Sequence, residues 1–225
     1  MHRTSVTGLP GDPHLNTLGE TQSQELANYF KELPISERPT AIFSSPLYRC
    51  LQTIRPTAQV LGLPIFIEHG LAEWYSTVKT DGSLHPSFPL ATDVFPFIPE
   101  IDPSWTSVVV PDRKGETEKD LHDRCEKLST ALHTKMDSEL QSENHSHILM
   151  VGHVAPLIAL IRVLLGDRSK HMSLGCTSVT ELRKAEAGGW DTISLGSGEH
   201  LKRGALFDWG FHDMYGPIRH RMPED

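Results

Sequence analysis

The segment ILMVGHVAPLIALI, residues 148–161, decides the fold class that the sequence indicates. It begins within a short apolar run over 147–151 that predicts a strand, and the nearly all-apolar run over 155–165 predicts a buried helix. A strand that leads directly into a helix is typical of α/β folds built on a parallel sheet. His153 lies at the junction, and ligands bind beyond the carboxyl ends of such strands. This imidazole is therefore a candidate for the functional site.

The same alternation of strand and helix occurs earlier in the chain. Short apolar runs predict strands over 41–44 and 64–68. Apolar residues at helical spacing predict helices over 17–33, from Pro46 to about Leu61, and over 115–140. Together these elements predict an α/β fold of three layers, in which a mostly parallel sheet carries helices on both faces.

The rest of the chain departs from this alternation. Residues at about 70–105 are rich in Pro, Ser, Thr and aromatic side chains and show little periodicity, which predicts an irregular insertion that shapes a site. Near the C-terminus, 177–183 and 191–195 are expected to pair as a hairpin. The tail over 201–225 is expected to be mostly irregular. We expect one domain over residues 1–225 that includes the insertion.

Composition excludes several function classes. The net charge is -8 and no basic block is present, so direct nucleic-acid binding is not expected. No apolar run approaches the length of about 18 residues that a membrane span needs. The three cysteines are widely spaced, which fits a reducing, intracellular compartment such as the cytoplasm or nucleus. The thirteen histidines form no HxxxH or HExxH pattern, so no metal site is expected.

Three residues of complementary chemistry follow three of the predicted strands. If the strands are parallel, Arg49, Glu73 and His153 gather at one edge of the sheet. An arginine binds phosphate oxygens bidentately, and the helix N-termini near Ser45 and Val154 add backbone N–H donors for an anion. His153 could donate to a phosphoryl group and Glu73 could serve as general acid. Taken singly, each side chain has an ordinary alternative: a surface arginine, a loop carboxylate and a core histidine.

Five segments in order resemble the histidine phosphatase superfamily, whose fold is the phosphoglycerate-mutase-like one. They are LNTLGETQSQEL (15–26), SSPLYRCLQT (44–53), GLAEWY (70–75), KGETEKDLHDR (114–124) and LMVGHVAPLIAL (149–160). Within the superfamily, the chain is most similar to a fungal branch that includes the histidine-phosphatase-like subunit of the transcription factor TFIIIC. The segments that carry this similarity are TGLPGDPHL (7–15), EWY (73–75), FPFIPEIDPSW (95–105) and RKGET (113–117).

The resemblance implies a role for each candidate residue. Arg49 corresponds to the second phosphate-binding arginine, Glu73 to the proton donor and His153 to the second active-site histidine. The chemistry of the family needs no cofactor: a histidine takes the phosphoryl group and water removes it. The expected ligand is a phosphate-bearing substrate or free phosphate, and Val154 is expected to offer its backbone N–H.

The sequence departs from the family at the nucleophile. The family carries an Arg-His-Gly motif after its first, central strand, and this sequence contains no such tripeptide. A strand of about five residues and the loop after it are expected to be absent, which would leave backbone groups of neighbouring strands unpaired. Two functions follow. One is a weakly active or inactive phosphomonoesterase for a metabolite or phosphoprotein. The other is a non-catalytic interaction module with protein partners, such as a TFIIIC subunit.

Overall fold

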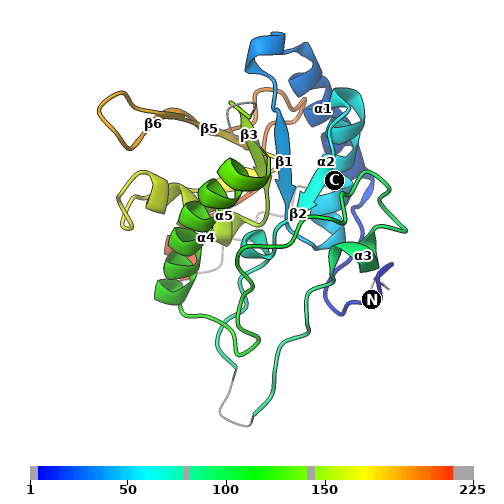
Figure 1. Ribbon diagram of the computed structural model, residues 1–225, viewed down its shortest axis with the longest axis vertical. Helices are drawn as coiled ribbons and strands as arrows, with labels where there is room; N and C mark the ends of the chain where they lie inside the picture. The colour runs from blue at the N-terminus through cyan, green and yellow to red at the C-terminus, as the bar shows by residue number, and fades with distance from the viewer. Residues whose placement is uncertain (1–4, 79–81, 141–144, 215–225) are drawn as a thin grey trace.

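The computed structural model describes residues 5–78, 82–140 and 145–214, and its centre is a parallel sheet (Figure 1). The strands are β1 (Ala41–Ser44), β2 (Ile65–Ile67) and β3 (Ile148–Val151), in the order β2-β1-β3. Ile42 of β1 lies opposite Ile65 on one side and Leu149 on the other. The three predicted strands and their parallel pairing are confirmed, so their carboxyl ends meet at one edge.

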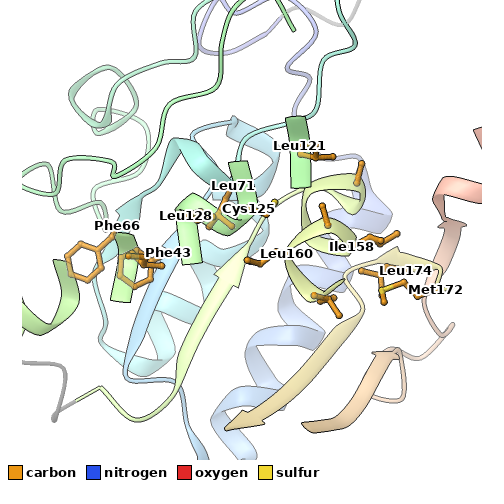
Figure 2. Packing of buried hydrophobic residues seen from close by; sticks show 14 of the residues in the cluster. Phe43, Phe66, Leu71, Leu121, Cys125, Leu128, Ile158, Leu160, Met172 and Leu174 are labelled. Atoms are coloured by element: carbon orange, nitrogen blue, oxygen red, sulfur yellow. The ribbon is translucent and has the colours of Figure 1, made fainter. Parts of the chain in front are cut away.

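Helices cover both faces of this sheet, as predicted. They are α1 (Thr17–Glu32), α2 (Tyr48–Leu61), α4 (Glu118–Glu139) and α5 (Val154–Leu164). Successive side chains of β1 point to opposite faces. Ile42 therefore packs with Leu51 and Ile54 of α2, and α1 packs on α2. Phe43 lies in the other cluster, which includes Leu128 of α4 and Ile158 of α5 (Figure 2).

Local signals explain where these helices begin and end. Asn16 caps α1, and its side chain accepts a hydrogen bond from the Gly19 N–H. Gly62 ends α2 in the left-handed conformation, with φ at 66°, which glycine adopts without steric cost. Thr117 opens α4 through a reciprocal capping box with Asp120. Pro46 lies before α2 rather than in its first turn, because the chain stays extended through Leu47.

The insertion is organised by one buried carboxylate. Glu68 follows β2 and accepts hydrogen bonds from the backbone N–H groups of Gly70, Val108 and Val109 and from the Trp105 indole. Regular structure in the described part of 70–105 is short, with a 3-10 helix at its start, His69–Leu71, and α3 (Ala91–Val94). Hydrogen bonds to Glu68 thereby connect the start of this segment, at Gly70, with its end, at Trp105.

The C-terminal part holds two antiparallel pairs. The predicted hairpin is present as β5 (Val179–Lys184) and β6 (Trp190–Ser197). The prediction of an irregular tail was wrong for part of its length, since β7 (Leu206–Trp209) pairs with β4 (Leu174–Cys176) and a 3-10 helix follows. This pairing joins segments about thirty residues apart, so no local pattern indicates it. The tail beyond residue 214 lies outside the described residues.

One edge of the parallel sheet is open in the described part of the chain. β3 pairs only with β1 there, and its residues Ile148–Val151 are apolar yet partly exposed, whereas β1 is fully buried. Parallel strands are normally covered on both sides. No helix in the described ranges is long and apolar enough to cross a bilayer.

Candidate active site

The edge where the three strands end brings the predicted residues together. Arg49 lies in the first turn of α2 after β1, and His153 is the residue between β3 and α5. Glu73 follows the 3-10 helix that comes after β2. Arg49 Nη2 lies 3.1 Å from Glu73 Oε2, and His153 Nδ1 lies 3.2 Å from the same oxygen. One carboxylate oxygen therefore bridges the guanidinium and the imidazole.

The far side of the His153 ring is held by two side chains that sequence reasoning did not assign to the site. Ser45 Oγ lies 2.9 Å from His153 Nε2, within hydrogen-bond distance, and the Cys50 sulfur lies 3.5 Å from the same nitrogen. Both side chains are buried. They come from the end of β1 and the start of α2, so the ring is fixed from the strand next to its own. The only sequence signal was that both belong to the motif that carries Arg49.

Asp12 is a third residue whose role in the site the sequence did not reveal. Its carboxylate is buried, with Oδ1 3.2 Å from Arg49 Nη1 and Oδ2 accepting a hydrogen bond of 2.7 Å from the Tyr48 N–H. It therefore orients the guanidinium with one oxygen and caps α2 with the other. The run Gly11-Asp12-Pro13 indicates only a loop, and Arg49 is more than thirty residues away.

The helix N-termini differ in what they offer to an anion. The N–H of Tyr48, the first residue of α2, is taken by Asp12, and the Ser45 N–H donates to Val151 O. The expected anion site near Ser45 is therefore not free. No side chain among the described residues caps α5, so none takes the N–H of Val154, the first residue of that helix.

The pKa values of Glu73 and His153 shift in opposite directions. Burial alone would raise the pKa of Glu73, but His153 and Arg49 beside it outweigh this and lower it to about 2. Burial alone would lower the pKa of His153, but the Cys50 sulfur and the Glu73 carboxylate raise it to about 9. At neutral pH the site therefore holds an imidazolium and a carboxylate.

The insertion contributes a wall beside Glu73. Tyr75 stacks on His85 and Phe88, with ring centroids 4.7 Å and 5.5 Å apart, and these residues line a small pocket next to Glu73 and Arg113. No group of three His, Cys, Asp or Glu side chains in the described ranges could hold a metal ion.

Comparison with known proteins identifies the family. Residues 2–196 match the model of the histidine phosphatase superfamily (branch 1). The chain belongs to the histidine phosphatase superfamily. A similar curated protein is the transcription factor tau 55 kDa subunit of Saccharomyces cerevisiae, 35% identical over 170 residues. The match covers 75% of this chain but spans only 38% of the yeast protein. The predicted resemblance to a transcription-factor subunit is thus confirmed.

Solved structures of superfamily phosphatases share the fold. The ecdysone phosphate phosphatase of Bombix mori superposes with a TM-score of 0.60 at 18% identity, covering 81% of this chain and 72% of that chain. The mycobacterial glucosyl-3-phosphoglycerate phosphatase bound to inorganic phosphate has a TM-score of 0.55 at 19% identity, covering 87% and 93%. At such identities the likeness establishes the fold alone.

Proposed function

We propose that this chain binds a phosphate group at Arg49 and His153 and that its 225 residues hydrolyse phosphomonoesters weakly or not at all. The observation that carries the proposal is the Glu73 oxygen held by both cationic groups, at 3.1 Å and 3.2 Å. An anionic oxygen between a guanidinium and an imidazolium is the arrangement that a phosphate oxygen needs. Turnover is slow in this proposal because the sequence contains no Arg-His-Gly to supply a nucleophile.

Charge balance describes how phosphate would enter. Arg49 and His153 carry two positive charges, and Glu73 and Asp12 carry two negative charges. A phosphate dianion would therefore compete with Glu73 for the same two donors. Once phosphate takes that place, the carboxylate faces a like charge, which raises its pKa and favours the protonated acid. Glu73 would then act as proton donor only in the phosphate-bound state, which reconciles that role with its low pKa in this structure.

The ligand class follows from the same site. A phosphorylated metabolite, a phosphoprotein or free phosphate fits two cationic groups and the N-terminus of α5. No cofactor, membrane or nucleic acid takes part in this proposal. The single histidine-phosphatase-like domain over 1–225, including the insertion at about 70–105, belongs to it as well.

A second function is favoured by the yeast relative. The 35% identity to the tau 55 kDa subunit extends over 75% of this chain, which supports a non-catalytic interaction module with protein partners in a transcription-factor assembly. Such a module would keep the fold and lose the chemistry. An intracellular location, cytoplasmic or nuclear, accompanies this reading.

Calorimetric titration with inorganic phosphate at neutral pH tests the phosphate site. Arg49→Ala should weaken binding roughly tenfold or more, because a hydrogen bond to a charged group contributes about 1.5–3 kcal/mol. Glu73→Gln should bind phosphate several-fold more tightly, because the competing charge is gone. Arg55→Ala is the matched control, since Arg55 lies on the same helix and pairs with Glu100 outside the site.

The outcomes separate the two functions. Loss of binding in Arg49→Ala but not in Arg55→Ala supports the phosphate site, and equal affinities in all variants would reject it in favour of the interaction module. An aryl phosphate assay tests the second half of the proposal. Rapid turnover would contradict slow hydrolysis, and its loss in His153→Ala would place the chemistry at this site despite the missing Arg-His-Gly.

A further inference from the structure

Two buried charged residues near the start of α4 have no role in the site described so far. Arg124 is 4% exposed and Glu116 is 7% exposed, and Arg124 Nη2 lies 3.0 Å from Glu116 Oε2. A buried ion pair loses hydration on both partners and often contributes no more stability than an apolar pair of the same size. Their burial therefore calls for an explanation in what else the two residues contact.

Arg124 donates hydrogen bonds to the backbone just before Glu73. Its Nη1 donates to the carbonyl oxygens of Ala72, at 2.9 Å, and Gly70, at 3.3 Å. Gly70 itself packs so closely on α4 that an added Cβ would lie 2.8 Å from Leu128 Cδ1. The segment that precedes Glu73 is thus fastened to α4 by a charge-assisted fork and by close packing.

Glu116 forms hydrogen bonds with the residues just after Glu73. Its carbonyl oxygen accepts a hydrogen bond of 2.8 Å from the Trp74 indole, and its N–H donates to Tyr75 O at 2.8 Å. A parallel bridge to Ser76 continues this contact. Residues on both sides of Glu73 are therefore anchored to one buried pair.

We infer that Arg124 and Glu116 are positioning residues that hold the Glu73 carboxylate between Arg49 and His153. The inference rests on the proposed function, in which that carboxylate competes with phosphate and later donates its proton. Neither residue donates to the phosphate-binding groups; both act through the backbone of residues 70–76. Burial raises the pKa of Glu116 and Arg124 opposes this rise, so loss of Arg124 would favour neutral Glu116 over an unpaired buried charge.

The chain offers a matched control for this pair. Arg162 of α5 is 7% exposed, and its Nη1 lies 3.2 Å from Glu118 Oε1, also at the start of α4. It also donates from Nε to the Lys170 carbonyl. Arg162→Met therefore removes a buried arginine of similar surroundings whose hydrogen bonds and ion pair, among the described residues, do not involve the segment 70–76.

NMR titration of the His153 ring tests the inference without any ligand. In Arg124→Met the pKa of His153 should fall by at least about one unit from its raised value, a tenfold change in proton affinity, because the carboxylate is no longer held beside the ring. Arg162→Met should leave that pKa unchanged. In a Glu73→Gln background, Arg124→Met should have no further effect, because the two changes act through one interaction.

Two results would contradict the positioning role of Arg124. An equal His153 pKa in Arg124→Met and the wild type, or a shift that persists in full in Glu73→Gln, would overturn the positioning role. If Arg124→Met does not fold, Arg124→Lys keeps a charge near Glu116 but loses the fork to two carbonyls, and a smaller shift in the same direction is expected. Failure of phosphate to bind the wild type would reject the proposed function and leave this readout intact.

Discussion

β1 and β3 are neighbouring strands of equal length. β1 leads to Arg49 and β3 leads to His153, yet the surroundings of the two strands differ. All four residues of β1 are buried between β2 and β3. All four residues of β3 are apolar, but Ile148 is 40% exposed and the other three are partly exposed. His147 O and Val151 O accept hydrogen bonds from the β1 side, so alternation turns the backbone groups of Ile148 and Met150 to the open edge.

This difference in burial shows how Arg49 and His153 are each held in position. Arg49 is mounted on a strand and helix that are packed on all sides, and Asp12 sets its direction. His153 follows an edge strand, and side chains from the segments after β1 and β2 hold it in place. Ser45 contacts one ring nitrogen and Glu73 the other. The edge strand thus depends on the site contacts for its order more than β1 does.

The largest effect expected from an apolar truncation compares a core residue of each strand. Phe43→Ala should lower the free energy of unfolding by about 3–5 kcal/mol, because it leaves a cavity in a fully buried cluster. Met150→Ala should cost well under half of that, since its partly exposed side chain can be replaced by water. Urea denaturation measures both, and equal losses would show that the β3 edge is as well covered as β1.

A smaller effect concerns the pH dependence of stability that arises from the ion pair between Glu73 and His153. The pKa of His153 is raised to about 9, so its stabilisation is full below pH 6.5 and is lost as pH rises through about 9. The pKa of Glu73 is lowered to about 2, so its stabilisation is present above pH 4.5 and is lost as pH falls through about 2. Thermal unfolding should therefore show a plateau for this pair between pH 4.5 and 6.5.

Glu73→Gln supplies the control for that profile. It should lower stability by about 1–3 kcal/mol on the plateau, the cost of losing a charged hydrogen bond, and flatten both limbs. Limbs of unchanged size in Glu73→Gln would assign the pH dependence to other groups and weaken the view that the site contacts hold β3.

The smallest effect concerns the exposed start of β3. Ile148→Lys should change the free energy of unfolding by no more than about 0.5 kcal/mol, as surface substitutions usually do. Ile42→Lys, one strand away, should prevent folding, because it buries an unpaired charge between the sheet and α2. A large loss in Ile148→Lys would mean that the start of the edge strand is packed in solution.

The sequence by itself determined the alternating elements and the three candidate residues. Hydrophobic periodicity predicts β1, β3 and α5, and parallel strands bring their carboxyl ends to one edge, so Arg49, Glu73 and His153 could be placed together without coordinates. The five family motifs predicted the superfamily that comparison confirmed. Each of these inferences uses information local to a segment of about ten to fifteen residues.

Only the tertiary structure decided which groups support those residues. Asp12 reaches Arg49 from 37 positions away, and Ser45 meets His153 across 108 positions. Glu116 and Arg124 form hydrogen bonds with a segment more than forty residues earlier in the chain. Such contacts depend on how the layers stack, and a sequence pattern records which face a residue occupies but not what lies opposite it. For the same reason, the sequence could not show that Asp12 takes the first N–H of α2, whereas no side chain of the described residues caps α5.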